Sequence, residues 1–396
     1  MARLKVAMLA TPWLKIPPQG YGGIEVVLDA LLRELQGLDV DVTLFSVGES
    51  RMKGVKLRSL FDKGLYQHIH KPLYENGPIV FGHIQSAINE IVASGDFDVI
   101  HDHNPFVGPS MLHNLSQFAQ LPPVIHTVHG PPFDYADDEL YAATNAYWQQ
   151  FRPLDGKQHR MFFVGISDAL MEPAPQTVKN MSLAPVHNAV TLDDFMFADR
   201  KKNYFLTLAR FSQDKGQHIA ARLCAELKQP LKMAGTVAGI DSVARLQSEL
   251  ANPMSDYRQS TDFRYYSDQV LPFTIDYRHI NYVGNLSGKR KLSTIANAKA
   301  LLFPITWDEP FGMAVIEALA SGTPVIAMNR GAMPEIIEHG VSGFLANDID
   351  EFKHYMQLVD QIDPAACRQR VADRFSSSVM AKNYVERYRQ AIELTT

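Results

Sequence analysis

Two glutamates eight positions apart, Glu309 and Glu317, have the spacing in this 396-residue chain that most directly suggests chemistry. They lie in the segment LLFPITWDEPFGMAVIEALASG, residues 301–322, which reads as an apolar strand, a short loop and a helix predicted to begin near Pro310. One carboxylate precedes the helix and the other lies about two turns inside it. The pair can accept hydrogen bonds on two sides of a bound molecule. A helix cap and an exposed helical residue would have the same spacing.

The turn between these glutamates offers backbone groups for an anion. The first amides of a helix point out of its end and bind phosphate, and a glycine leaves the approach free of a side chain. The amides predicted to face a ligand belong to Phe311, Gly312, Met313 and Ala314. A diphosphate with a sugar on one side and a ribose on the other would engage these amides and both carboxylates.

Two cations precede this segment, in FLTLARFSQDKGQH at residues 205–218. Arg210 follows a predicted strand, and Lys215 comes just before a predicted helix. Because strand ends in a parallel α/β domain meet at its ligand site, both cations can reach one diphosphate. The alternative is a solvated turn in which Lys215 pairs with its neighbour Asp214.

The amino-terminal half has a second glycine-rich turn and an unusual group of histidines. Gly22 and Gly23, in PPQGYGGIE, follow the first predicted strand and open a helix, although the G-x-G-x-x-G spacing of a dinucleotide site is absent. The turn either contacts a ligand or is structural. The histidines lie at the ends of apolar strands: His101, His103, His126 and His129. With Asp102 they raise the possibility of a metal site, but their separate strands lack a compact ligand pattern, and buried structural roles are the alternative.

Aromatic residues follow these histidines and allow two interpretations. They are Phe133, Tyr135, Tyr141, Tyr147 and Trp148. They form either a platform for a sugar ring or the packed face of a helix.

The elements that must position these residues alternate between short apolar runs and helical periodicity, which predicts parallel sheets built from βαβ units. The strands expected before the middle of the chain are Leu4–Ala10, Val40–Val47, Phe97–His101, Val124–Val128 and Met161–Ile166. Charged residues interrupt the pattern at 186–202, where we place a domain boundary. Strands are expected again at Tyr204–Ala209, Leu231–Ala234, Ile280–Val283, Ala300–Pro304 and Pro324–Ala327.

Three further segments complete this reading of the chain. Helices are expected from Ile24, at Ile84–Val92 and at Asp168–Lys179, where Ser167 is a candidate cap. Residues 251–277 fit neither periodicity and are interpreted as an extended excursion over the surface or the cleft. Residues 364–396 have a helical pattern.

Composition limits the class of protein. Hydrophobic residues make up 46% and charged residues 20%, which suits two globular cores. A net charge of −5 without clustered basic residues argues against a nucleic-acid partner. Cys224 and Cys367 match no metal spacing and suit a reducing compartment. Neither a signal peptide nor a membrane-spanning run is recognised, so a cytoplasmic protein is expected, with peripheral contact at the inner membrane face left open.

The glutamate pair, with its EPFG turn and the following ASGTPV, resembles the E-x(7)-E signature of retaining glycosyltransferases of family 4, the glycosyl transferases group 1. The resemblance covers most of the chain. It implies the α/β GT-B fold, in which two Rossmann-like doubly wound domains face a central cleft. On this basis residues 1–190 form the acceptor-side domain and 191–375 the donor domain, while 376–396 form a helix that packs back on the amino-terminal domain.

The resemblance also assigns roles to residues. Glu309 is expected to bind the donor sugar and Glu317 the ribose, with Arg210 and Lys215 on the phosphates, in an element similar to the family's R-x(4)-K. HTVHGPPF resembles the segment whose histidine lines the sugar pocket, which gives His129 and leaves His126 and Ser167 unassigned. Gly22 and Gly23 correspond to the loop that closes over the donor phosphate. The base is expected near Val283 and Gly284. The catalytic candidates are Glu309, Arg210, Lys215 and His129.

The implied activity is transfer of a hexose-type sugar from a UDP- or GDP-sugar to a hydroxyl group, without cofactor or metal. Retention by front-face attack would let the leaving phosphate take the acceptor's proton, as the family resemblance favours. A phosphorylase or nucleotide-sugar hydrolase is the alternative enzyme, and a silent nucleotide-sugar-binding or scaffold protein is the alternative of another class. The sequence does not give the acceptor, which could be a carbohydrate, a lipid-linked or a small molecule, nor the sugar, the base or the oligomeric state.

Overall fold

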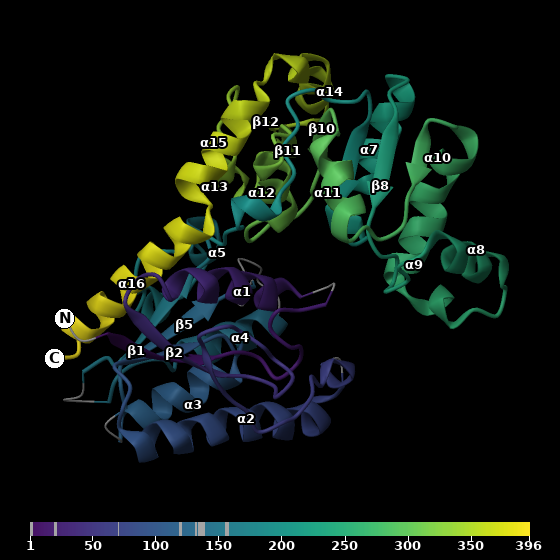
Figure 1. The fold of residues 1–396 in the computed structure, drawn as a ribbon. Helices are drawn as coiled ribbons and strands as arrows, with labels where there is room; N and C mark the ends of the chain where they lie inside the picture. The colour runs from purple at the N-terminus through teal and green to yellow at the C-terminus, as the bar shows by residue number, and fades with distance from the viewer. Residues whose placement is uncertain are drawn as a thin grey trace. The chain divides into compact units, whose positions relative to one another are not determined.

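The protein is described here by a computed structural model that covers residues 3–19, 22–69, 71–118, 121–130, 133, 139–154 and 158–396, with the backbone alone for residues 139–143. Contacts within the chain divide it into two compact units. The first consists of Met1–Ala189 together with Ser377–Thr396, and the second of Val190–Ser376 (Figure 1).

The first unit is built on a six-stranded parallel sheet with the order β3-β2-β1-β4-β5-β6. Its strands are β1 (Leu4–Leu9), β2 (Val40–Phe45), β3 (Lys56–Arg58), β4 (Val99–Asp102), β5 (Val124–Val128) and β6 (Met161–Gly165). Strands β4, β5 and β6 are buried at every position, as is usual for parallel strands covered on both faces.

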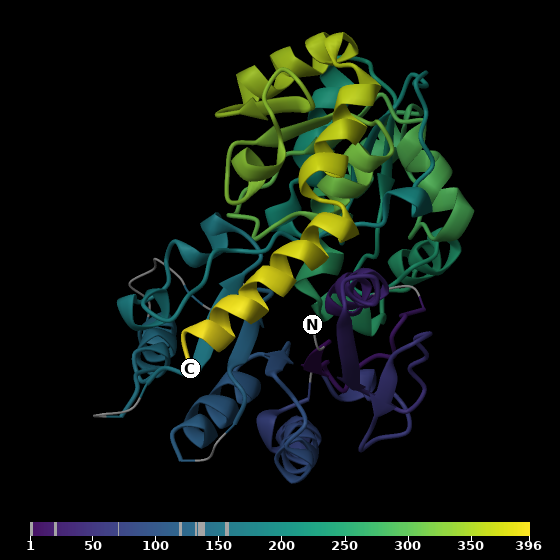
Figure 2. The ribbon, with the colours of Figure 1, turned by 60° about the vertical axis from the view of Figure 1, so that its left-hand side comes forward.

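Helices cover both faces of this sheet. They are α1 (Gly23–Leu35), α2 (Leu73–Ser94), α3 (Val107–Ser116), α4 (Glu139–Trp148), α5 (Asp168–Met171), α6 (Gln176–Lys179) and α16 (Ser377–Glu393). Figures 1 and 2 show α1 and α16 on one face and α2 and α3 on the other. The C-terminal helix α16 packs beside α1, and Ser377 Oγ donates a hydrogen bond to Glu34 Oε1 at 2.8 Å.

The second unit repeats the design with the order β12-β11-β10-β7-β8-β9. Its strands are β7 (Phe205–Leu208), β8 (Leu231–Ala234), β9 (Ile280–Tyr282), β10 (Ala300–Phe303), β11 (Val325–Met328) and β12 (Gly343–Ala346). Its helices are α7 (Gln217–Glu226), α8 (Val243–Ala251), α9 (Thr261–Tyr265), α10 (Leu271–Asp276), α11 (Gly288–Ala296), α12 (Met313–Ala320), α13 (Met333–Ile336), α14 (Ile349–Leu358) and α15 (Pro364–Arg374).

The predicted fold class is confirmed, since both sheets are parallel and α-helices connect most of their strands. Two local predictions were wrong. Residues 251–277 are largely helical, with a π-helix at Tyr266–Val270 between α9 and α10, and the aromatic side chains of Phe263, Tyr265 and Tyr266 pack inward instead of following one stripe. The single helix expected over Asp168–Lys179 is two short helices, interrupted by prolines at 173 and 175.

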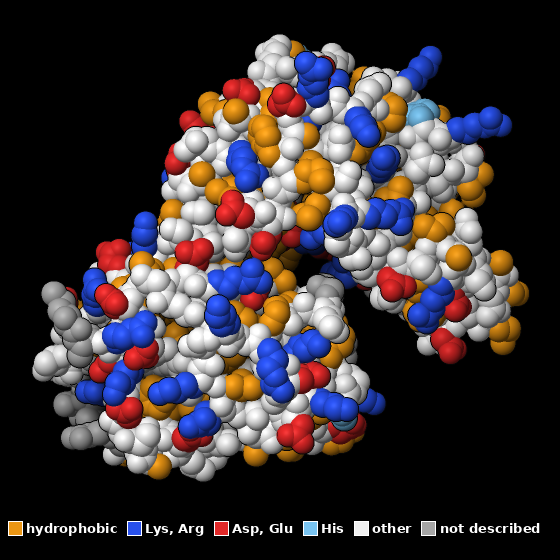
Figure 3. Space-filling view, viewed as in Figure 1, with side chains coloured by type: hydrophobic (Ala, Val, Ile, Leu, Met, Phe, Trp, Pro, Cys, Tyr) orange, Lys and Arg blue, Asp and Glu red, His pale blue; other side chains and the backbone are white. Residues whose placement is uncertain are grey.

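No helix in the described ranges is long and apolar enough to cross a membrane. Figure 3 shows acidic and basic side chains interspersed on the visible face, without a continuous basic area, in line with the net charge of −5.

Candidate active site

Lys215 and Glu309 meet in the unit formed by residues 190–376. Lys215 Nζ donates a hydrogen bond to Glu309 Oε2 at 2.5 Å, and Trp307 Nε1 donates to the same oxygen at 3.0 Å. The ammonium also lies 4.4 Å from the centroid of the Trp307 ring, in cation–π contact. The Lys215 and Glu309 side chains are only 14% and 12% exposed. The structure thus brings two predicted site residues into direct contact and adds Trp307, to which the sequence had given no role.

Two loops hold this pair because their backbones pack closely. The loop after β7 carries the 3-10 turn Gln213–Lys215, and the other loop follows β10. Thr306 N donates to Asp214 O at 2.9 Å across the two loops. Gly216 has a φ of +68°, and a Cβ there would lie 2.0 Å from the Pro304 carbonyl oxygen. Only glycine allows this approach.

Arg210 lies on the same loop but contacts a different carboxylate. Its Nη1 donates to Asp262 Oδ2 of α9 at 2.6 Å, and the arginine side chain is 54% exposed. Both residues line a polar pocket of about 500 Å³ together with Gln213 and Gln269. A pair this exposed contributes only about 0–1 kcal/mol, so a bound diphosphate can compete with Asp262 for the arginine.

Glu317 also has a basic partner that the sequence interpretation missed. It is the fifth residue of α12, nearer the helix start than predicted, and its Oε1 accepts a hydrogen bond from Lys291 Nζ of α11 at 2.8 Å. The basic run at residues 289–291 was the available signal. Glu317 is therefore not an exposed surface glutamate, because its side chain is only 13% exposed.

The turn between the two glutamates differs from the prediction at one point. Helix α12 begins at Met313 and not near Pro310, because Gly312 has a φ of +99° that a helix cannot contain. Phe311 is buried, with its ring 6.0 Å from that of Phe375, whereas Met313 and Ala314 are partly exposed. Of the four predicted amide positions, Phe311 thus has its side chain in the core.

The predicted base contact lies directly after β9. Val283 N donates to Met233 O at 2.9 Å, and its carbonyl accepts from Arg290 at 3.2 Å. Gly284 has a φ of +78°, and its carbonyl accepts from Gly235 N at 3.1 Å. These backbone groups already have partners, so a base at this strand end would bind beside them or replace those bonds.

Gly22 and Gly23 lie at the start of α1 in the first unit. A Cβ at Gly22 would lie 2.9 Å from Pro18 Cβ, whereas no described atom lies within 4 Å of the Cβ position at Gly23. Residues 20–21 of this turn lie outside the described residues. Glu25, which the sequence interpretation did not select, is buried and accepts a hydrogen bond from Thr11 at 2.8 Å; burial raises the pKa of this carboxyl group.

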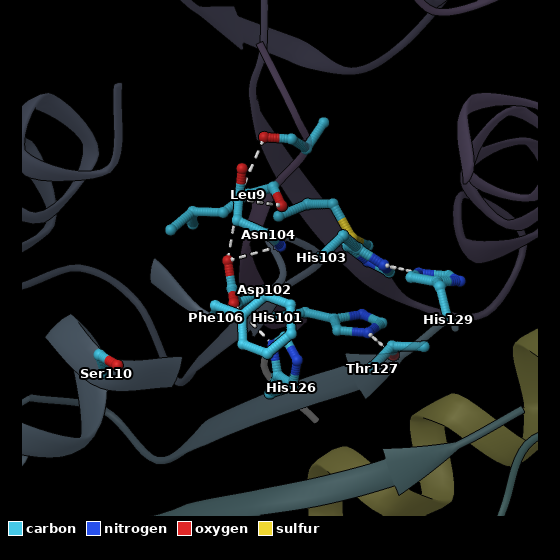
Figure 4. Close-up of polar contacts among 12 residues, drawn as sticks. Leu9, His101, Asp102, His103, Asn104, Phe106, Ser110, His126, Thr127 and His129 are labelled. Atoms are coloured by element: carbon cyan, nitrogen blue, oxygen red, sulfur yellow. Dashed lines mark hydrogen bonds and ion pairs between the residues drawn. The ribbon is translucent and has the colours of Figure 1, made fainter. Parts of the chain in front are cut away.

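The four candidate histidines of the first unit belong to three separate hydrogen-bonded groups, which together are called the histidine network here (Figure 4). His101 bonds Tyr388 OH of α16 and Thr127 Oγ1, both at 2.8 Å, and therefore joins the sheet to the C-terminal helix. His103 Nδ1 and His129 Nε2 are 2.8 Å apart. His126 Nδ1 is 2.7 Å from Asp102 Oδ2. The structural interpretation holds for His101, and no cluster of three or more His, Cys, Asp or Glu that could hold a metal occurs among the described residues.

A pocket of about 410 Å³ lies beside this network. Residues that line it include His103, Phe106, His126, Thr127, His129 and Trp148. Trp148 is itself 1% exposed and packs against Phe133 and Phe151 with ring centroids 5.3 and 5.1 Å away. The helix-packing interpretation therefore applies to Trp148. Tyr135 and the Tyr141 side chain lie outside the described residues.

Ser167 has the capping role that its sequence position suggested. Its Oγ accepts a hydrogen bond from Leu170 N at 3.0 Å, at the start of α5.

Acid should destabilise the first unit through its buried histidines. Burial lowers the pKa of His129 from 6.5 to about 3, and it lowers the pKa values of His101 and His103 as well. Below pH 6.5 the unfolded chain then binds more protons than the folded chain. The free energy of unfolding therefore decreases as the pH is lowered from 6.5 towards 3. The slope is at most about 1.4 kcal/mol per pH unit for each such histidine.

Urea unfolding at pH 7.5 and pH 5 measures this change in the free energy of unfolding. His129→Gln should flatten the dependence and the exposed His354→Gln should not; a stability unchanged between these pH values would contradict the prediction.

Comparisons with known proteins agree with this architecture. Residues 193–366 match the family model described as Glycosyl transferases group 1, and residues 21–170 match the model described as Glycosyltransferase Family 4. Over 394 residues the chain is 21% identical to spore coat protein SA of Bacillus subtilis (strain 168), with 96% of each chain covered.

Solved structures show the same fold. Sucrose-phosphate synthase from Thermosynechococcus elongatus superposes with a TM-score of 0.71 at 18% identity, over 99% of this chain and 100% of that one. Anabaena HepE in complex with UDP-glucose superposes with a TM-score of 0.65 at 14% identity, over 98% and 100%. The fold is therefore that of the GT-B class of glycosyltransferases. Within that class, the chain carries a Glycosyltransferase Family 4 domain followed by a Glycosyl transferases group 1 domain.

Proposed function

We propose that the protein is a retaining glycosyltransferase that transfers a hexose-type sugar from a nucleotide diphosphate sugar to a hydroxyl group. The observation that carries this proposal is the contact of Lys215 with Glu309, two residues that lie far apart in the sequence and meet in neighbouring loops. A cation and a carboxylate that are both only partly exposed match a donor with an anionic leaving group next to a polyhydroxylated sugar. HepE, whose structure contains UDP-glucose, supports a UDP-linked donor.

The proposed chemistry is a front-face transfer. As the bond from the anomeric carbon to the β-phosphate oxygen breaks, negative charge grows on the phosphate, where Lys215 and Arg210 stabilise it. The acceptor oxygen bonds to the same face of the anomeric carbon, and its proton passes to the leaving phosphate. Glu309 holds sugar hydroxyls and Glu317 the ribose, while His129 borders the sugar. With two cations on the phosphates, the transfer needs no resident metal.

Calorimetric titration with UDP, GDP and ADP and their glucose conjugates tests the donor half of the proposal. We expect the nucleotides of one base to bind most tightly. Glu317→Gln should weaken the binding of that nucleoside diphosphate. Glu338 is an exposed glutamate on the same unit, and Glu338→Gln should leave this binding unchanged. Absence of binding by every nucleotide would overturn the proposal.

Turnover then separates the activities. Sugar transfer to an added hydroxyl acceptor is expected. Nucleotide release without acceptor would identify a hydrolase, and formation of sugar phosphate that depends on phosphate would identify a phosphorylase. Tight donor binding without any turnover would identify a silent binding protein.

A further inference from the structure

The pocket beside the histidine network has properties that define what it binds. We propose that it takes an uncharged ring compound bearing hydroxyl groups, and that His126 Nε2 accepts a hydrogen bond from one of those hydroxyls. That this compound is the sugar acceptor rests on the proposed function, because His129, which lines the same pocket, is the residue proposed to border the donor sugar. At about 410 Å³ the pocket lies within the range of ligand sites, about 300–1,000 Å³.

Asp102 fixes the orientation of His126. Its side chain is fully buried; Oδ1 accepts from the Asn104 side chain at 2.9 Å and Oδ2 lies 2.7 Å from His126 Nδ1. A Cβ at Gly108 would lie 2.1 Å from Oδ2, so the backbone of α3 closes over the carboxylate. Asp102 is thereby shielded from water and is 0% exposed. Figure 4 shows Asn104 and His126 beside its carboxylate.

This arrangement leaves one ring nitrogen of His126 for a ligand. In the neutral imidazole that donates from Nδ1 to Asp102, Nε2 is a hydrogen-bond acceptor. Within the described ranges no protein group bonds Nε2, and the His126 ring lines the pocket. A purely structural histidine of the same network, His101, has both nitrogens engaged, at 2.8 Å each. The difference between these two histidines points to a ligand for His126.

The charged side chains described around the pocket do not favour an anionic compound. No lysine or arginine is among the residues described as lining it. Burial lowers the pKa values of His103 and His129, which keeps both rings neutral near pH 7. The Asp102–His126 pair has a net charge of zero or −1 in either protonation state of the histidine. A phosphate or carboxylate in this pocket would lose its water without gaining a countercharge.

Phe106 provides the surface for a ring. It is 47% exposed, and its ring centroid lies 5.8 Å from that of Trp148. Its backbone has a φ of +57° and a ψ of −59°, and Val107 N donates to Pro105 O at 2.6 Å, which makes a γ-turn that non-glycine residues rarely adopt. Tyr147 OH donates to the Phe106 carbonyl at 2.7 Å and helps to hold this conformation. Strained backbone that presents a side chain to a pocket is common at binding sites.

Saturation-transfer NMR on the full chain tests the proposal with phenyl glucoside, phenyl galactoside and phenyl mannoside, each compared with its 6-phosphate. We expect a neutral glycoside to bind at least tenfold more tightly than its phosphate. His126→Phe should weaken that binding about five- to tenfold, and the exposed His354→Phe should not change it. Equal or tighter binding of the phosphates, or no binding by any neutral glycoside, would overturn the proposal.

A second variant covers the case in which His126→Phe does not fold. Phe106→Gly removes the ring at a half-exposed position and permits the positive φ, so thermal stability should be kept while glycoside binding falls several-fold. Glycoside binding unchanged in Phe106→Gly would contradict the pocket assignment. Titration of the same variants with UDP separates this proposal from the donor function. The affinity of both variants for UDP should equal that of the wild type. If neither the wild type nor the variants bound UDP, the donor function would be refuted, while the glycoside result would still decide the pocket assignment.

Discussion

Lys215→Ala should lower sugar transfer about 10²- to 10³-fold while the protein remains folded. The expected loss corresponds to one preorganised charge at the oxygen where negative charge develops, about 3–4 kcal/mol of transition-state stabilisation. Because Lys215 is 14% exposed and lies over the Trp307 ring, its ammonium is confined to the site before the donor arrives, where it has only to exchange Glu309 for the phosphate. Initial rates at saturating donor measure the effect.

A matched control keeps this result interpretable. Lys353 forms an ion pair with Glu226 at 2.6 Å on the surface of the same unit, with 37% and 44% of the two side chains exposed. Lys353→Ala removes an ion pair of nearly the same length, 2.6 Å against 2.5 Å, without touching the site and should keep wild-type rates. Full activity in a folded Lys215→Ala protein would remove Lys215 from the mechanism.

The sequence predicted best the parallel strands that are buried in the sheets. The strand Val124–Val128 was predicted with the observed bounds, and Leu231–Ala234 likewise. Parallel strands that are buried on both faces give apolar runs that are easily read. Two short edge strands, Lys56–Arg58 and Gly343–Ala346, were not recognised, since neither has a clear apolar run bounded by turns.

Long-range partners could not be predicted because they depend on tertiary contacts. Arg210 pairs with Asp262, which lies in the segment that was read as an extended excursion. Lys291 pairs with Glu317 from another helix. Asp102 was noted only as a potential metal ligand, whereas the structure pairs it with His126. Residue types and local spacing thus selected both charged groups of the Lys215–Glu309 pair. They did not reveal the partners of Arg210, Glu317 and His126, which come from other parts of the chain.

Glu309→Gln should separate sugar recognition from nucleotide recognition. The amide keeps the shape of the side chain and can still accept from Trp307 Nε1, which now lies 3.0 Å from the carboxylate. It loses the charge that strengthens hydrogen bonds to sugar hydroxyls, typically about 1.5–3 kcal/mol. We therefore expect kcat/KM to fall about 10- to 100-fold, measured with the preferred nucleotide sugar.

Binding of the nucleoside diphosphate alone should respond in the opposite direction. In the unliganded site the Glu309 carboxylate holds Lys215 at 2.5 Å, and a diphosphate must draw the ammonium away from it. Glu309→Gln weakens that competing contact, so UDP should bind to this variant at least as tightly as to the wild type. Glu317→Gln should instead weaken the binding of UDP. If Glu309→Gln lowered the affinities for UDP and UDP-glucose by the same factor, Glu309 would contact the nucleotide. The division of roles between the two glutamates would then be wrong.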